Sequence, residues 1–205
     1  MRYALQTIAV VVLFIALPIT TVRAQPYGLQ VAESVETRSE SQLDITAGVV
    51  FNSDGSCVGL RDTFACTEDV RIFAEVGAVT LKDANTDLAA QGGFTVSLPI
   101  DVPFDLGVRG AVYGSNGDAT DTIGGNLMAL ASKEAFYPNL FFYGGLGLDY
   151  RSIQTGQDTS TEETDRVTDP LLSLGTLLPL NEHLLVYIEV TVTDDPFIGC
   201  GLRYR

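Results

Sequence analysis

Side chains able to support catalysis or bind a metal are few in this chain of 205 residues. It has one histidine, His183, and three cysteines, Cys57, Cys66 and Cys200. His183 is far in sequence from Cys57 and Cys66 and lies in a short polar stretch, so no metal-ligand spacing is formed with them. No serine-nucleophile motif and no phosphate-binding loop occurs. We therefore expect no catalytic residue, no metal site and no cofactor, and a protein that is not an enzyme.

The cysteines suggest a structural disulfide instead. Cys57 and Cys66 are both found in the polar, glycine-containing stretch of residues 52–69. In an oxidising compartment this spacing suits a local disulfide, and we predict a Cys57–Cys66 bridge with Cys200 as a thiol. Pairing of Cys200 with either of the others stays open, because it depends on whether that stretch meets the last segment of the chain.

The positions of the charged residues depend on the strands that carry them. Apolar and polar residues alternate in most of the chain, as in Leu43, Ile45, Ala47, Val49 and Phe51, and there are 20 glycines. This pattern predicts an all-β protein. The charged residues of the segments are always opposite the apolar row.

The strand count leads to a barrel of eight to ten strands. Residues 101–103 and 181–183 form tight turns, and residues 152–165 and 83–91 form polar loops. Nine segments run from Leu43 to the end, and an up-and-down barrel needs an even number. A tenth strand comes from residues 27–35 or from residues 57–64, whereas losing a weak strand gives eight. We predict a closed antiparallel barrel.

The first residues carry an export pattern. Arg2 precedes an apolar run, residues 8–17, and residues 22–24 end in alanine before Gln25, as in a cleaved secretory signal peptide. The run is too short to cross about 30 Å of hydrocarbon. We expect a signal peptide at residues 1–24, a leader or first strand at 25–41 and the barrel at 42–205. The net charge of −14 argues against nucleic acid as a partner.

Two kinds of segment resemble bacterial outer-membrane proteins. Residues 197–205, FIGCGLRYR, resemble the closing strand of outer-membrane barrels, although Arg205 stands where that family has an aromatic residue. Residues 103–110 and 143–148, with their G-x-G spacing and flanking aromatic residues, resemble small opacity-type barrels. The resemblance covers residues 43–205 and implies a transmembrane barrel in the bacterial outer membrane. It also implies lipid and lipopolysaccharide, the barrel-insertion machinery and periplasmic chaperones as partners.

In such a barrel the two faces have different surroundings. The apolar row meets lipid, and we expect this of Leu140, Phe142, Leu146, Leu148, Ile188, Val190 and Leu202. The opposite row points into the lumen, where opposite charges pair to offset the cost of desolvation. The expected lumen charges are Arg71, Glu75, Asp105, Arg109, Asp149, Glu189 and Arg203.

We therefore expect a structural or surface-interaction role, with the lumen closed by its own charges. One alternative is a small cation-preferring porin or channel. The other is a soluble exported β-sandwich or lipocalin-like binding protein, because alternation is also found in soluble sheets.

Overall fold

The computed structural model describes residues 32–35, 42–81, 86–116, 120–135, 140–155, 163–194 and 196–205. The expected signal peptide and most of the leader lie outside these residues. The ten strands are β1 (Leu43–Phe51), β2 (Gly55–Ala65), β3 (Val70–Leu81), β4 (Thr86–Leu98), β5 (Asp105–Asn116), β6 (Thr120–Glu134), β7 (Phe141–Thr155), β8 (Glu163–Pro179), β9 (Leu184–Val192) and β10 (Phe197–Tyr204).

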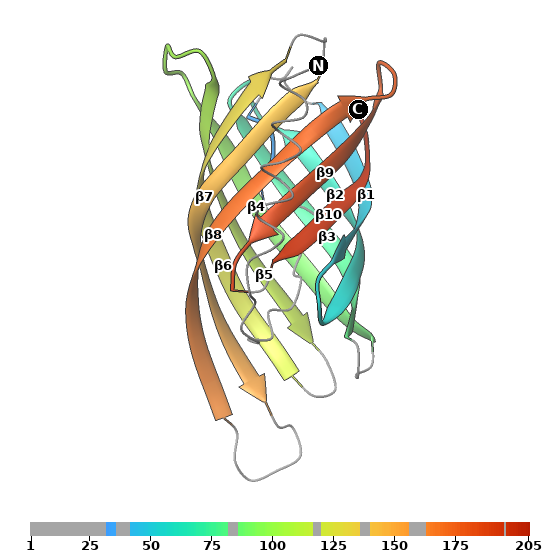
Figure 1. Ribbon diagram of the computed structural model, residues 1–205, viewed down its shortest axis with the longest axis vertical. Coiled ribbons are helices and arrows are strands. Elements are labelled where there is room, and N and C mark those ends of the chain that lie inside the picture. The colour runs from blue at the N-terminus through green and yellow to red at the C-terminus, as the bar shows by residue number, and fades with distance from the viewer. Residues whose placement is uncertain are drawn as a thin grey trace, which may run out of the picture.

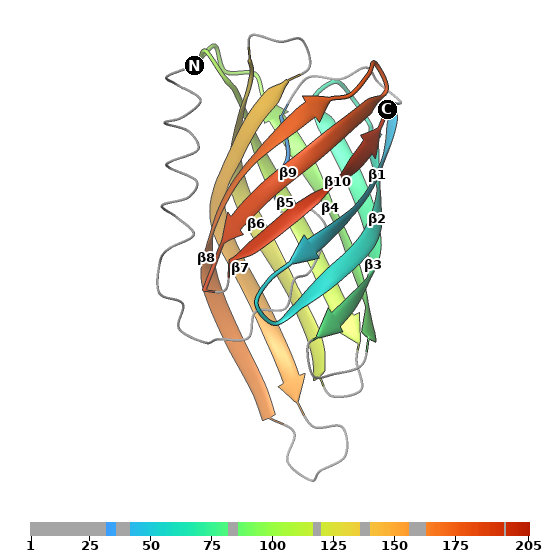
Figure 2. The ribbon, with the colours of Figure 1, turned by 45° about the vertical axis from the view of Figure 1, so that its right-hand side comes forward.

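The strands form one closed antiparallel barrel (Figure 1). Each strand pairs with the next along the chain, and β10 pairs with β1, with Ile45 opposite Tyr204 and Phe51 opposite Ile198. This seam is visible in Figure 2, where β1 and β10 lie side by side. The predicted all-β, up-and-down barrel is confirmed, and the strand number is ten.

The tenth strand is β2, which contains residues 57–64, one of the two segments that were expected to be able to supply it. Arg61 and Thr63 are buried inside the barrel, whereas Leu60 and Phe64 are exposed outside it. This two-residue alternation is what makes the stretch a strand rather than a loop. Residues 32–35, by contrast, belong to no strand.

The predicted loops at residues 83–91 and 152–165 are shorter than expected. Strand β4 already begins at Thr86, and β7 and β8 extend to Thr155 and from Glu163. These are among the longest strands, with 15 and 17 residues, and they project beyond the other strands (Figure 1). Their register pairs Thr155 with Glu163, so much of the predicted loop at residues 152–165 is a paired hairpin.

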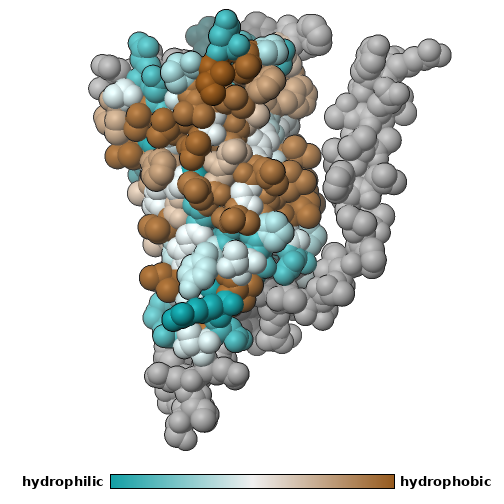
Figure 3. Space-filling model, turned by 90° about the vertical axis from the view of Figure 1, so that its left-hand side faces the viewer, coloured by the Kyte–Doolittle hydropathy of each residue, from teal (hydrophilic) through white to brown (hydrophobic). Residues whose placement is uncertain are grey.

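The outer face of the barrel is apolar. Leu88, Val112 and Ile123 are each about 70% exposed (74%, 69% and 70%). Apolar residues cover much of the wall in Figure 3, and hydrophilic residues gather toward both of its ends. Of the residues expected to face lipid, Phe142, Leu146, Leu148, Ile188 and Leu202 are exposed, and Leu140 and Val190 are half-buried. Within the described part of the chain, no helix is long and apolar enough to cross a membrane.

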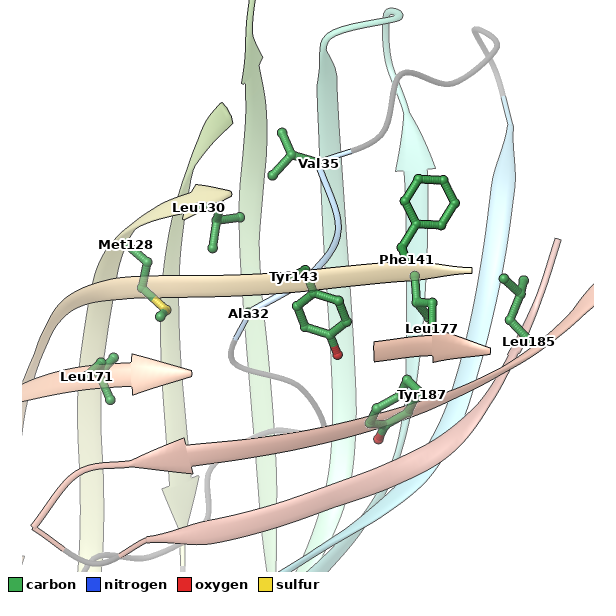
Figure 4. Packing of buried hydrophobic residues seen from close by; sticks show 10 residues of the cluster. All are labelled: Ala32, Val35, Met128, Leu130, Phe141, Tyr143, Leu171, Leu177, Leu185 and Tyr187. Carbon is green, nitrogen blue, oxygen red and sulfur yellow. The ribbon is translucent and has the colours of Figure 1, made fainter. Parts of the chain in front are cut away.

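Apolar side chains also pack inside the barrel, on one side of the lumen. Ala32 and Val35 lie inside the barrel, where they pack against side chains of β6 to β9 (Figure 4). Two tyrosines, Tyr143 and Tyr187, each lie close to a glycine of a neighbouring strand. The interior is therefore packed, and part of the packing comes from a segment outside the wall's own strands. The cluster consists of Ala32, Val35, Met128, Leu130, Phe141, Tyr143, Leu171, Leu177, Leu185 and Tyr187.

The contact between Gly48 and Tyr187 leads to a prediction. A Cβ atom at Gly48 would lie 2.6 Å from the Cys200 carbonyl oxygen and 3.1 Å from Cζ of Tyr187. Because backbone and a packed ring must both move, we expect Gly48→Ala to lower the free energy of unfolding by about 1–3 kcal/mol. Urea unfolding in detergent micelles measures the change. The matched control is Gly92→Ala, whose Cβ meets nothing closer than 3.7 Å; equal losses in both variants would contradict the prediction.

Candidate functional site

The structure brings most of the predicted lumen charges together inside the barrel. Arg71, Glu75, Arg109, Asp149, Glu189 and Arg203 are all buried. The prediction was wrong for Asp105, which is exposed. Asp105 is the first residue of β5, so it shares the inward row of Arg109 but lies at the mouth of the barrel, where water reaches it.

Residues 32–35, the inner segment, lie inside the lumen and are fully buried. Side chains of the wall bind its backbone. The amide of Ala32 donates to Glu189 Oε1 (3.3 Å), and the amide of Val35 donates to Ser132 Oγ (2.9 Å). Arg71 Nη2 donates to the Ser34 carbonyl at 2.9 Å, and Ser97 Oγ donates to the Val35 carbonyl at 3.4 Å. The inner segment is thus held by β3, β4, β6 and β9 without joining any sheet ladder.

Glu33 carries the charge of the inner segment. Its Oε1 accepts a hydrogen bond from the Thr95 hydroxyl and lies 4.0 Å from Arg71 Nη2, and its Oε2 lies 3.8 Å from Arg203 Nη2. Burial alone raises the pKa of this carboxyl, but the guanidinium groups of Arg71, Arg203 and Arg61 outweigh it and hold the pKa below its ordinary value. The carboxylate therefore stabilises the fold at neutral pH, and this contribution is lost as the pH falls through the lowered pKa.

A close ion pair lies beside this group. Arg61 on β2 contacts Glu75 on β3 through Nη2 (2.6 Å) and Nε (2.7 Å). These two residues face each other in the strand register. The guanidinium groups of Arg61 and Arg109 both lie over the Phe73 ring, at 4.7 and 4.6 Å from its centroid. The ring thus provides cation–π stabilisation to two buried cations.

A second charged cluster is found on β5, β7 and β8. Arg151 on β7 pairs diagonally with Asp169 on β8, which lies opposite Asp149 in the strand register, and Arg151 is 3.9 Å from Asp149. The Tyr113 hydroxyl is 2.8 Å from both oxygens of Asp149 and donates its proton there. These side chains are buried as well. The inside of the barrel thus holds charged side chains on β7 and β8 as well as on β2 and β3.

Sequence reasoning missed two central residues, Glu33 and Arg61. Arg61 alternates with Leu60 and Phe64, so the strand pattern of β2 was a usable signal. Glu33 had no such signal, because its segment is neither a strand nor a recognisable motif. Only the folded barrel shows that its carboxylate meets arginines from β3 and β10.

The predicted Cys57–Cys66 bridge is wrong. No disulfide joins the cysteines, all of which are within the described residues. Cys57 is buried near the start of β2, whereas Cys66 is exposed just after its end. An extended strand of nine residues spans roughly 30 Å, whereas a disulfide needs Cα atoms about 5.5 Å apart. Cys200 faces outward on β10 and is half-buried.

The chain's histidine lies away from the charged clusters. His183 is exposed in the turn between β8 and β9, and its ring centroid is 6.1 Å from that of Tyr204. Among the described residues no three histidine, cysteine or carboxylate side chains gather as metal ligands.

A small cavity remains in the lumen between Cys57, Glu75, Gln91 and Tyr113. Its volume is about 10 Å³, which is about the least that one water molecule requires. This cavity is lined by inward side chains of β2, β3, β4 and β5.

The ion pair of β2 and β3 can be tested by breaking it. Glu75→Ala leaves the Arg61 guanidinium buried without its closest carboxylate, and we expect a loss of about 3–5 kcal/mol in the free energy of unfolding. Urea unfolding in micelles gives the value. The double variant Arg61→Met/Glu75→Leu removes both charges and should be more stable than the single variant. A double variant as unstable as Glu75→Ala would show that the packing, not the charge, is decisive.

Comparison with known proteins found no match to this chain among family models or curated proteins. Its function is therefore inferred from the apolar outer wall and from the charged, filled lumen.

Proposed function

We propose that this protein spans the bacterial outer membrane as a closed β-barrel and has a structural or surface-interaction role. The observation that carries the proposal is the distribution of side chains. The largest fully buried side chains include four arginines, whereas leucine, valine, isoleucine and phenylalanine are exposed around the outside.

This distribution is the reverse of that in a soluble barrel. Burial of apolar surface stabilises a soluble protein by about 25 cal/mol per Å², and large exposed apolar patches mark contact surfaces. The exposed side chains of this wall include Val76, Leu127 and Leu146, each at least 60% exposed (62%, 60% and 65%), which supports contact with an apolar environment. Hydrocarbon provides one, and it favours the membrane barrel over the soluble exported alternative.

A closed lumen is supported by the inner segment and the ion pairs. Ten strands leave limited room inside, and here that room holds residues 32–35 and the side chains of Arg61, Glu75 and Arg109. The alternative of a small cation-preferring channel has less support, because a cation would have to pass these arginines. The role we propose is also non-enzymatic, which fits the exposed position of His183.

The projecting part of β7 and β8 is the surface best suited to contact a partner. It carries exposed polar side chains, among them Thr164, Asp165, Arg166 and Thr168. In a membrane barrel this end would face the cell exterior. The start of β1 and the end of β10 lie at the opposite end of the barrel. Outer-membrane lipid and lipopolysaccharide would surround the wall, and the insertion machinery and periplasmic chaperones would deliver it.

The membrane proposal predicts different effects of an added charge at two outward positions. Leu146 lies in the middle of β7, opposite Ala129 and Leu172. In hydrocarbon, Leu146→Arg should cost roughly 2–4 kcal/mol and reduce recovery in the outer-membrane fraction. Thr164→Arg, on the projecting part of β8, is the matched control and should be neutral. Full recovery of the Leu146→Arg protein, or a wild type found in the soluble periplasmic fraction, would contradict membrane residence.

If the lumen is closed, the protein should not conduct ions across a planar bilayer. Purified wild-type protein, inserted into the bilayer and verified by its heat-dependent migration on a gel, should give no stable single-channel steps, because the inner segment fills the lumen. A porin of known conductance, reconstituted in parallel, controls for insertion. Stable cation-selective steps would instead establish the channel alternative.

A further inference from the structure

We propose that the lumen contains a binding site for a small carboxylate ion, formed by Arg71, Thr95 and Arg203, and that the chain's own Glu33 occupies it. The inner segment then acts as an internal ligand, and a free organic acid with one carboxylate is the class of molecule that competes for the site. This inference concerns the lumen alone and does not depend on membrane residence.

The walls of this site belong to the barrel and not to the inner segment. Arg71 on β3 and Thr95 on β4 face each other directly in the strand register. Arg203 lies on β10, and β1 and β2 separate it from β3. All three side chains are buried. Each of the three residues is carried by a strand that is paired on both sides, so the backbone that presents these donors belongs to the wall.

The donors match a carboxylate. Glu33 Oε1 accepts from the Thr95 hydroxyl and approaches Arg71, while Oε2 approaches Arg203 from the other side. One hydroxyl and two guanidinium groups thus approach the two oxygens of a single carboxylate. Guanidinium groups are the side chains best suited to this anion. A cation at this position would meet two guanidinium groups of like charge.

The inner segment contacts the wall through side-chain hydrogen bonds, as a bound ligand does, and not through strand pairing. Its hydrogen bonds to the wall run between backbone and side chains or from Thr95 to Glu33, and none is a strand ladder. The arginine nitrogens lie 3.8 and 4.0 Å from Glu33, whereas the Arg61–Glu75 pair closes to 2.6 Å. The two arginine contacts are therefore looser than the structural pair beside them, which leaves room for a small ion to adopt closer geometry.

The experiment is chemical rescue in the full-length chain. Glu33→Ala removes the carboxylate and leaves space among Arg71, Thr95 and Arg203, so we expect a lower Tm in detergent micelles. Sodium acetate at about five times its Kd should then raise the Tm of this variant by roughly 2–4 °C. Sodium chloride at the same concentration should not. If Glu33→Ala is not recovered folded, the yield of heat-resistant barrel after refolding with acetate or chloride gives the same comparison.

Two controls separate site binding from a general salt effect. Wild type and Glu33→Gln keep the site filled and should not respond to acetate, and Glu33→Ala/Arg71→Met should lose the response because one donor is gone. Equal acetate shifts in wild type, Glu33→Gln and Glu33→Ala would overturn the proposal. So would a Glu33→Ala protein whose Tm or refolding yield acetate leaves unchanged.

Discussion

Buried arginine is the constraint on which this structure depends. Arg61, Arg71, Arg109 and Arg203 lie fully inside a narrow barrel, and a guanidinium group cannot escape the cost of burial by losing its proton. Each must therefore meet carboxylates, hydroxyl groups or aromatic faces. Glu75 and the ring of Phe73 supply part of this within the wall. Glu33 supplies another part from a segment that the wall itself does not contain.

The same constraint explains why the interior is assembled from unlike parts. On one side of the lumen, tyrosine rings lie close to glycines of neighbouring strands and leave little volume unfilled. Cations and carboxylates approach one another across strands both at β2 and β3 and at β7 and β8. The inner segment joins the two, because Ala32 and Val35 pack into the apolar cluster while Glu33 meets the arginines. One short stretch thus completes both the packing and the charge balance.

The sequence predicts the features that depend on neighbouring residues and misses those that depend on contacts between residues distant in the chain. Alternation along a strand is local, so the strands and the inward charges such as Glu189 and Arg203 were predictable from neighbouring residues. Asp105 obeys the same alternation but lies at the barrel mouth. The alternation tells which face of the sheet a residue occupies, not how deep in the barrel it lies. The cysteine prediction failed because a polar stretch was taken for a compact loop when it is largely the extended strand β2. The position of Glu33 depends on four strands distant in sequence, and no local pattern carries that information.

The seam between β1 and β10 determines the order in which the molecule can be assembled. Its partners come from opposite ends of the described chain, so the ladder that closes the cylinder has the largest loop-closure entropy to overcome and must form late. Until then β1 and β10 are open edges that invite pairing with other chains. Arg71 and Thr95 lie on early strands and can engage Glu33 before closure, whereas Arg203 arrives only with the last strand. Closure of the β1–β10 seam therefore completes two things together, the cylinder and the set of arginines around Glu33.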